Sequence, residues 1–499
     1  MGLSPAQATA AVCRRSVDAR KIGRIKMVYS VRITPIGDAS QVLSRVTDQK
    51  NIRLFAESSA PSLARGDKRL SHRPVVVGFG PAGMFAALLL AKNGMRPLVL
   101  ERGPDMDLRA DACARFWRTG ELDPEANVQF GEGGAGSFSD GKLVTRIGDH
   151  RCRFVLETFA AHGAPPEILI EAKPHVGTDR LREIVKSMRR EIVSLGGEVR
   201  FGVCLTELRG EDPHLSAVTT AGEVPCEALV LAVGHSARDT VTMLANHGLM
   251  LEKKPFSVGF RIEHTQQEVN GMFYGQGAHP SLPPAEYQLS HRMGDRGCYT
   301  FCMCPGGVVV PAASEEGGIV TNGMSYSGRD GAMANAAVVA SVLPEDIEGG
   351  PLDAIAFQRA IERGAYAEGY VAPMERADKF AGIRSSCRTA AQPTYARGVR
   401  ECSLTGLLPI QAESLIKSGL ARFEALYPGF AGGLLTGVET RTSAPWRMLR
   451  ENAQAMGFQG VYPAGEGAGF AGGIVSAAVD GLRAAEAILA QYRSCEAGS

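Results

Sequence analysis

The chain has 499 residues, of which 44% are hydrophobic and 21% are charged, and its formal net charge is +1. This length permits two or three domains with substantial cores. The near-neutral charge gives no electrostatic basis for a nucleic-acid partner, and no run of about eighteen apolar residues predicts a membrane span. The 11 cysteines, an odd number without paired spacing, favour reduced thiols and a cytoplasmic location.

The first 68 residues are predicted to form a small α+β module. We expect a helix near Pro5–Arg15, a strand over Met27–Ile33 and a second helix near Ala39–Thr47. Basic residues cluster before the strand, so an organellar presequence is the alternative interpretation. No apolar core with a small-residue cleavage site follows, which argues against a secretory signal. Residues 58–73 have the composition of a linker.

The segment from 75 to 101 contains the most informative motif. We expect, in order, a buried strand at Val75–Val77, the turn Gly78-Phe79-Gly80-Pro81-Ala82-Gly83, a helix over Met84–Ala91, and a strand at Leu98–Leu100 that ends at Glu101. G-x-G-x-x-G between a strand and a helix, with an acid closing the next strand, is typical of a dinucleotide-binding unit. The second glycine lets a pyrophosphate approach the helix N-terminus, and the acid can accept hydrogen bonds from a ribose.

Predicted helices and strands continue along the rest of the chain. A second glycine-dense loop covers 129–142. We expect strands over Glu198–Leu205, Leu229–Val233, Ser257–Glu263 and Val308–Val310. We expect helices over Asp179–Leu195, near Leu352–Arg363 and Ala412–Leu426, and a final amphipathic helix over Ile474–Leu489. We predict an α/β fold in which a Rossmann-like, GR2-type FAD-binding domain, 69–239 and 436–499, carries an inserted α+β substrate domain, 240–435.

Three features indicate FAD rather than NAD(P). Between Gly83 and Glu101 lie 17 residues, a spacing typical of FAD-binding members of this fold. The segment Ala232-Val233-Gly234 closes a buried strand and resembles a signature of flavoprotein disulfide reductases. Tyr462–Glu466 resembles the flavoprotein motif in which an acid after glycine binds a ribityl hydroxyl. The helix that begins near Ile474 would direct its positive end at the flavin pyrimidine edge.

Several segments spread along the chain form a specific combination: Arg15–Lys21, Gly131–Lys142, Lys254–His264, Phe301–Gly307, Asn322–Tyr326, Gly437–Ser443 and the C-terminal glycine motif. In this combination the chain resembles a family described as uncharacterised FAD-dependent dehydrogenases, within the NAD(P)/FAD-dependent oxidoreductase superfamily. The resemblance implies a bound FAD and redox chemistry, and it implies no particular substrate.

The residues expected to contact the cofactor lie in the two glycine loops, at the ends of buried strands and in the C-terminal motif. They are Gly78, Gly80, Pro81, Ala82, Gly83, Glu101, Arg102, Gly133, Gly134, Ala135, Gly136, Ser137, Lys142, Val203, Ala232, Gly234, Gly465, Glu466, Gly472, Gly473 and Ile474. For the second loop, with its Asp140-Gly141 turn, a plain surface loop is the alternative.

The catalytic candidates are Arg261, His264, Asn322 and Arg441. Arg261 and Glu263 share one face of a predicted strand, so they could anchor a carboxylate substrate while His264 supplies an acid or base; a structural ion pair is the alternative. Arg441 either binds an anionic substrate or forms a salt bridge between domains. His235 either touches the cofactor or is a solvated loop histidine.

Cys302 and Cys304 would point to one face of an extended strand. They are either a redox-active pair that exchanges with the flavin, with Cys298 nearby, or inert packed thiols. The C-x-C spacing lacks the helix-start geometry that lowers a thiol pKa, and no metal-ligand set surrounds it. We therefore favour inert packing and predict no metal site.

The sequence as a whole predicts an FAD-dependent oxidoreductase that transfers a hydride between a small organic substrate and the flavin. NAD(P)H would visit transiently, or an electron-transfer partner would supply electrons, because only one dinucleotide motif is present. A flavin monooxygenase or halogenase is an alternative enzyme, although Gly467-Ala468 after Glu466 fits a dehydrogenase or reductase better. A non-catalytic flavin-binding sensor or assembly factor is the alternative from another class, and an NAD-only dehydrogenase is a weaker one.

Overall fold

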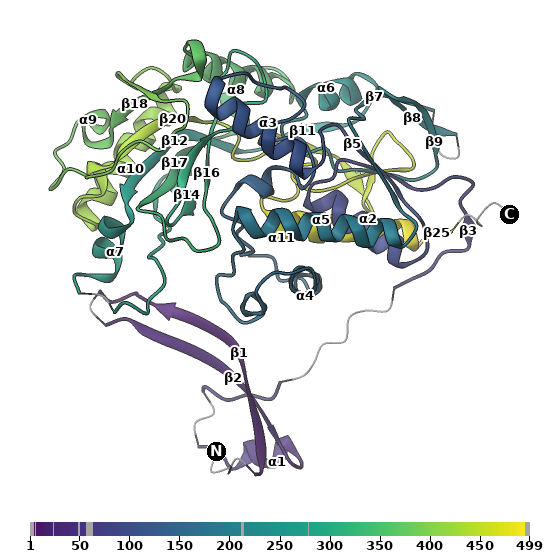
Figure 1. Ribbon diagram of the computed structural model, residues 1–499, viewed down its shortest axis with the longest axis horizontal. Helices are drawn as coiled ribbons and strands as arrows, with labels where there is room; N and C mark the ends of the chain where they lie inside the picture. The colour runs from purple at the N-terminus through teal and green to yellow at the C-terminus, as the bar shows by residue number, and fades with distance from the viewer. Residues whose placement is uncertain are drawn as a thin grey trace.

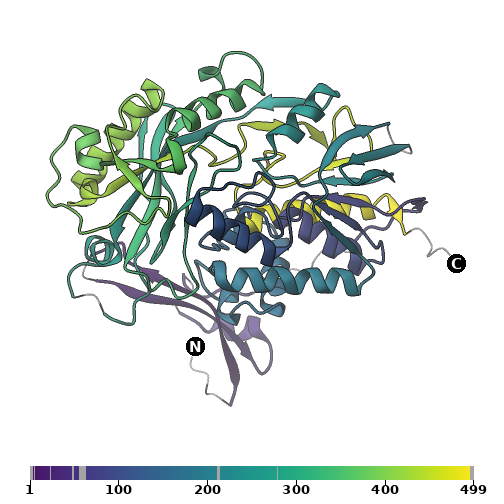
Figure 2. The ribbon, with the colours of Figure 1, turned by 45° about the horizontal axis from the view of Figure 1, so that its top comes forward.

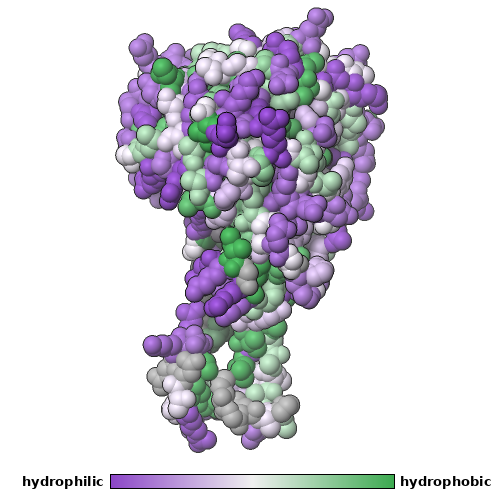
Figure 3. Space-filling model, turned by 90° about the vertical axis from the view of Figure 1, so that its left-hand side faces the viewer, coloured by the Kyte–Doolittle hydropathy of each residue, from purple (hydrophilic) through white to green (hydrophobic). Residues whose placement is uncertain are grey.

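The computed structural model describes residues 4, 6–22, 24–47, 50–55, 63–210, 214–277 and 279–494. The chain forms two bodies that lie against each other, one around a parallel sheet and one around a larger mixed sheet (Figures 1 and 2). An N-terminal hairpin projects away from both bodies (Figure 3). Within the described ranges, no helix is both long and apolar enough to cross a membrane.

Five of the described strands form the parallel sheet, in the order β24-β10-β4-β5-β6. Their bounds are Val75–Val77 for β4, Leu98–Glu101 for β5, Glu198–Phe201 for β6, Leu229–Leu231 for β10 and Val461–Pro463 for β24. The chain moves from β4 outward to β6 and then returns to the other side of β4 with β10. The direction of strand order therefore reverses between β4 and β10, which is where open α/β sheets bind ligands at their carboxyl ends.

Helices cover one face of this sheet, and a small antiparallel sheet with one helix covers the other. The helices of the first face are α2 (Pro81–Lys92), α4 (Arg151–Ala161), α5 (Thr178–Ser194) and α11 (Ile474–Leu489). The second face is covered by β7 (Leu205–Arg209), β8 (Leu215–Thr219), β9 (Gly222–Cys226) and α6 (Arg238–Asn246). Helix α3 (Met106–Thr119) follows β5. The predictions of α2, α5, β10 and α11 are confirmed, with small shifts at their ends.

The larger sheet contains seven described strands in the order β13-β14-β17-β12-β20-β18-β19. They are β12 (Phe256–Thr265), β13 (Ser290–Met293), β14 (Arg296–Cys304), β17 (Met333–Val342), β18 (Ala372–Arg376), β19 (Val399–Glu401) and β20 (Leu434–Glu439). The central strand β12 is buried almost throughout. Helix α10 (Ile410–Leu426) packs across β12, β14 and β17, and α7 (Gln266–Tyr274), α8 (Asp353–Gly364) and α9 (Ala377–Ala381) complete this body.

Short two-stranded pairings connect the rest of the chain. They are β11 (Leu251–Lys253) with β21 (Trp446–Met448), β15 (Val308–Pro311) with β16 (Thr321–Met324), β22 (Arg450–Glu451) with β23 (Gln454–Ala455), and β3 (Lys68–Arg69) with β25 (Tyr492–Arg493). The β3–β25 pair joins the end of the predicted linker to the C-terminus, whereas residues 58–62 of that linker lie outside the described residues.

The predicted helix near Pro5–Arg15 is wrong, because Ala8–Asp18 forms strand β1, although Pro5 itself is not among the described residues. This strand pairs antiparallel with β2 (Lys26–Pro35), and Val12 lies opposite Val31. Cross-strand pairs of this kind stabilise a sheet and override weak helical preference. The following helix α1 (Ala39–Ser44) begins where predicted and is shorter.

Candidate functional site

A cavity of about 1230 Å³ lies at the carboxyl ends of β4 and β10 and continues to strands β13 and β14 of the larger sheet. This volume exceeds the roughly 300–1000 Å³ of typical small-molecule pockets. The cavity therefore has room for an extended dinucleotide and for a second small molecule.

The glycines of the turn after β4 serve different purposes. Gly78 has φ +95°, and a Cβ atom there would overlap the carbonyl oxygen of Ala232, while a Cβ at Gly83 would overlap the carbonyl oxygen of Gly78. Those two positions therefore need glycine for packing. A Cβ at Gly80 would meet only Gly134 Cα at 3.7 Å, so this position is open toward the cavity. Because Gly80 is the N-cap of α2 and has no side chain, it leaves the first-turn N–H groups available to a ligand.

Glu101 links the two glycine loops. Its buried carboxylate accepts hydrogen bonds from the backbone N–H groups of Phe79 at 2.7 Å, Gly103 at 2.9 Å and Gly131 at 3.0 Å. An ionised carboxylate offers about four acceptor positions. Glu101 lines the cavity, so it retains capacity for one further donor such as a ribose hydroxyl.

Arg109 shapes the second glycine loop and was not predicted. Its fully buried guanidinium group donates to five backbone carbonyl oxygens, those of Asn127, Val128, Gly131, Glu132 and Gly134. Burial lowers the pKa of Arg109 to about 10, and it remains charged at neutral pH. The sequence signal for this role is weak: Arg109 lies on the stripe of α3 that also holds the buried residues Met106 and Cys113.

The C-terminal glycine motif closes over the first turn. A Cβ at Gly465 would lie 2.8 Å from Ala82 Cβ, and one at Gly467 would lie 2.5 Å from the carbonyl oxygen of Gly234. Gly473 is the N-cap of α11 and leaves that helix start uncapped by a side chain. Two segments separated by almost four hundred residues in sequence therefore meet at one cavity, as predicted from the motifs.

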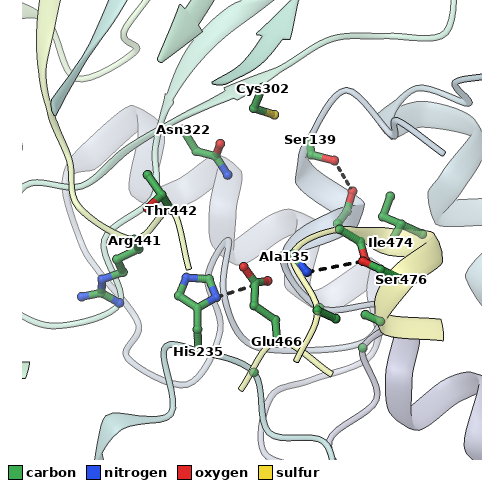
Figure 4. Close-up of a pocket in the computed structure, with 18 of the residues that line it drawn as sticks. Ala135, Ser139, His235, Cys302, Asn322, Arg441, Thr442, Glu466, Ile474 and Ser476 are labelled. Atoms are coloured by element: carbon green, nitrogen blue, oxygen red, sulfur yellow. Dashed lines mark hydrogen bonds and ion pairs between the residues drawn. The ribbon is translucent and has the colours of Figure 1, made fainter. Parts of the chain in front are cut away.

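His235 and Glu466 form a pair inside the cavity, with Nδ1 of the histidine 3.5 Å from a carboxylate oxygen (Figure 4). His235 is 9% exposed, so it is not a solvated loop histidine. Its other ring nitrogen, Nε2, is buried and has no hydrogen-bond partner among the described residues. This nitrogen is available to a polar ligand.

Most of the predicted cofactor residues line the cavity, including Arg102, Lys142 and Val203. Those that do not are Gly83, Gly133, Ser137 and Gly465, which pack directly behind it. Ser137 is fully buried, and its hydroxyl oxygen occupies the space that a side chain at Gly133 would need.

The catalytic candidates are placed differently from one another. Asn322 and Arg441 line the cavity, whereas Arg261 and His264 do not. His264 is fully buried, and its Nε2 donates to the carbonyl oxygen of Phe430 at 2.8 Å. Arg261 pairs with Glu439 rather than with Glu263. The predicted substrate-contacting roles of Arg261 and His264 therefore do not fit the structure, because strand β12 buries both side chains in the sheet.

Arg441 belongs to a buried cluster of charged and hydroxyl side chains at the boundary between the two bodies. Its guanidinium group bonds Glu362 of α8 and the hydroxyls of Ser236 and Ser314. Glu362 also pairs with Arg238 of α6 at 2.8 Å. Burial raises the pKa of Glu362, but the two guanidinium groups outweigh burial and hold that pKa well below its usual range. The domain-interface alternative for Arg441 fits these contacts.

A group of charged and thiol side chains forms the wall of the cavity opposite His235. Cys302 lines the cavity at a bulge in β14, and Cys304 is fully buried behind it. The ammonium group of Lys142 lies 3.4 Å from a carboxylate oxygen of Asp140, which also accepts from Ser325 and Arg329. Asp140, which Ser325 and Arg329 hold in position, thus holds the ammonium group of Lys142.

Comparison with known proteins identifies the family. A model of the family described as FAD-dependent protein, C-terminal domain-like, matches residues 255–442, the span from β12 to just past β20. A protein of Clostridium beijerinckii, described as an uncharacterized protein, is 47% identical over 493 residues, which is 96% of this chain and 92% of that protein. The chain belongs to this family of FAD-dependent proteins. It is a flavoprotein that binds FAD.

Solved structures resemble this FAD-dependent protein only distantly. Glycine oxidase from Geobacillus kaustophilus has a TM-score of 0.35 at 13% identity, covering 86% of this chain and 97% of its own. A mutant of halogenase PltM, in complex with FAD, has a TM-score of 0.37 at 11% identity, covering 83% and 68%. CtdE in complex with FAD has a TM-score of 0.32 at 12% identity, covering 82% and 81%. Likeness at these scores carries no argument about the reaction.

Proposed function

We propose that this FAD-dependent protein is a dehydrogenase or reductase that transfers a hydride between a small organic substrate and the flavin. The observation that carries the proposal is the continuity of the cavity. The same hollow is lined by the Gly78–Ala82 turn, by the first residues of α11 and by strand β14 of the larger sheet. One end suits a dinucleotide and the other admits a second molecule, and hydride transfer requires both to be held together.

The nucleotide end supports a Rossmann-like, GR2-type assignment. The N–H groups at the start of α2 would hold the pyrophosphate, and Glu101 would accept a ribose hydroxyl. His235 Nε2 is buried without a hydrogen-bond partner among the described residues, and its side chain lines this cavity. Orphaned polar atoms of this kind fit a polar ligand. When bound, FAD supplies two-electron hydride chemistry.

The ring end is formed by Glu466 and by the start of α11. Glu466 would accept a ribityl hydroxyl, held in place by its pairing with His235. The uncapped N-terminus of α11 would favour negative charge beside it, because the partial positive charge of a helix lies at that end. The start of α11 would therefore raise the affinity of the site for a ring that gains electrons.

Asn322 is the side chain best suited to orient the substrate. Its Oδ1 accepts from Arg261 Nη2 at 3.2 Å and from the backbone N–H of Gly323 at 2.8 Å. With the oxygen engaged, the amide NH₂ group is the part left to bond a ligand, and Asn322 points into the cavity in Figure 4. We propose that this NH₂ group donates to a substrate oxygen. The buried Arg261 then acts as a positioning residue for Asn322.

The test is to identify the cofactor released from purified protein and then to mix the protein anaerobically with candidate donors. NADH, NADPH and small organic acids form the panel, because an electron donor would have to enter the open end of the cavity. The proposal predicts that at least one donor bleaches the flavin absorbance at a rate that saturates with donor concentration. Tightly bound FAD that no donor reduces would instead support a flavin-binding sensor or assembly factor.

A further inference from the structure

The two cysteines of β14 are brought together by an irregularity of the strand. The register of β14 against β17 shifts between Phe301 and Cys304, and Cys302 has φ +44°, a left-handed conformation that is unusual for a residue other than glycine. Residues two apart in a regular strand are about 6.6 Å apart, near the upper limit for a disulfide. A bulge bends the strand and shortens this separation.

The two thiols have different surroundings. Cys302 is partly exposed in the cavity, whereas Cys304 is fully buried. The Cys304 thiol donates to the carbonyl oxygen of Cys302 at 3.3 Å, and the two thiol groups interact electrostatically. A molecule in the cavity therefore reaches Cys302 first, with Cys304 directly behind it.

Positive charge near a thiol lowers its pKa, and in many redox cysteines a helix N-terminus supplies that charge. Here two cationic side chains supply it. Arg261 donates to the carbonyl oxygen of Cys302 at 2.9 Å, and the positive charge of Lys142 in the glycine loop also acts on both thiols. The hydrogen bond from Cys304 lowers the pKa of Cys302 to about 5; burial opposes this shift, and Lys142 and Arg261 reinforce it. The pKa of Cys304 is raised by its hydrogen bond to Cys302 and by burial. These surroundings favour the thiolate at Cys302 and the thiol at Cys304.

We propose that Cys302 and Cys304 are a dithiol–disulfide couple that exchanges an electron pair with the flavin of this cavity. In the oxidative direction the Cys302 thiolate and the Cys304 thiol form an S–S bond and lose two electrons and one proton, and the oxidised flavin takes up the two electrons with that proton. The step reverses when reduced flavin is the donor. A disulfide of this short spacing is strained and readily reduced, which suits exchange rather than structural cross-linking. This proposal depends on the proposed function in one respect, which is that FAD must be bound in the cavity.

The first test is an anaerobic dithionite titration of the air-oxidised protein with its bound flavin. The wild-type protein is expected to take up four electrons per flavin, two for the ring and two for the disulfide. The Cys304→Ser variant is expected to take up two. Cys204→Ser is the matched control, because Cys204 also lines the cavity but burial raises its pKa, and it should still take up four. Two electrons per flavin in the wild type would overturn the couple.

The second test reads the thiols directly. Trypsin releases residues 297–329 as one peptide, which contains Cys298, Cys302 and Cys304. After air oxidation, denaturation and alkylation, the couple predicts one alkylated cysteine in this peptide, and three after prior reduction. Three alkylated cysteines in the oxidised sample would contradict it. A colourless, flavin-free preparation would count against the proposed function. Peptide mapping after oxidation with diamide would still show whether Cys302 and Cys304 form a disulfide.

Discussion

At the scale of single residues, the shape of the cavity depends on glycines as much as on charged side chains. Gly78 and Gly83 are needed so that the turn can pack, whereas Gly80 leaves the start of α2 open toward the cavity. Around them, Glu101 and Arg109 hold the backbone of both glycine loops through hydrogen bonds to N–H and carbonyl groups. The chain thus presents backbone N–H groups to the cavity and uses buried charges to keep them in position.

Gly80→Val is expected to abolish retention of FAD while leaving the fold intact. A Cβ atom at this position has only ordinary van der Waals contact with Gly134, so the added methyl groups project into the pyrophosphate position instead of into protein. The measurement is the ratio of flavin absorbance to protein absorbance after gel filtration, with thermal unfolding as the check on folding. Gly148→Ala, at an open position outside the cavity, should keep full occupancy. Normal FAD content in Gly80→Val would contradict the placement of the cofactor.

Asn322→Asp is expected to lower kcat/KM for the substrate about tenfold or more, because it replaces the donating NH₂ group with an acceptor and leaves the bond to Arg261 possible. The FAD content should not change. Asn335→Asp is the control, since Asn335 also accepts from Arg261, at 2.9 Å, but does not line the cavity. The rate of flavin reduction by the donor found in the screen provides the measurement. Equal losses in both variants would show that Asn322 acts only through Arg261.

Residues that act through local backbone geometry were predictable, and residues that act through distant contacts were not. The geometry of the G-x-G-x-x-G turn and that of the Gly465–Gly473 motif each follow from a pattern of a few neighbouring residues. Arg109 bonds carbonyl groups 18 to 25 residues away, which no local pattern records. The strand containing Arg261 and His264 was predicted, but its burial on both faces, which removes these side chains from the cavity, follows only from the sheet around it.

At the scale of secondary-structure elements, the site is assembled by the close packing of α2 against α11. A Cβ at Gly481 would overlap the carbonyl oxygen of Ala82, so the two helices touch backbone to backbone at this position. This contact fixes the starts of both helices at the cavity, although they are separated by almost the whole chain. Helix periodicity predicted each helix, and only the tertiary structure shows their contact.

Gly481→Ala is expected to destabilise the protein by about 1–3 kcal/mol, because overpacking forces the helices apart. FAD occupancy should fall with stability, since the start of α11 moves away from the cavity. The control is Gly364→Ala at the end of α8, where a Cβ meets nothing within 4 Å and the helix gains up to about 1 kcal/mol. Chemical denaturation of the two variants gives the comparison. Equal stabilities would mean that α2 and α11 do not touch as described.

At the scale of the whole molecule, Glu362 joins the two bodies. It accepts from Arg238 of α6, which follows the parallel sheet, and from Arg441, which follows the larger sheet. All three side chains are buried. The charges therefore compensate one another only while the bodies stay together. This cluster thus holds the larger-sheet side of the cavity against the parallel-sheet side.

Glu362→Gln is expected to cost about 3–5 kcal/mol of stability near pH 7, because it leaves two buried guanidinium groups without their common partner. The lowered pKa of Glu362 gives the pH dependence its sign: the stabilisation is complete above the unfolded pKa, about 4.3, and is lost as pH falls toward the folded value. The difference in unfolding free energy between wild type and variant should therefore stay constant from pH 7 to pH 5 and narrow by about 1–2 kcal/mol by pH 3, because each pH unit below the unfolded pKa removes about 1.4 kcal/mol. The exposed Glu348→Gln should change stability by less than about 0.5 kcal/mol. A pH-independent difference would contradict this role.

The central claim is that two distant glycine segments enclose one FAD between the parallel sheet and the larger sheet. A crystal structure of the protein purified with its cofactor tests it most directly. The account predicts electron density for the adenosine beside Glu101, for the pyrophosphate at the start of α2, and for the flavin ring between the start of α11 and the β14 wall that carries Cys302. Density for the flavin anywhere else, or a cavity filled only by solvent in protein that carries a flavin, would contradict it.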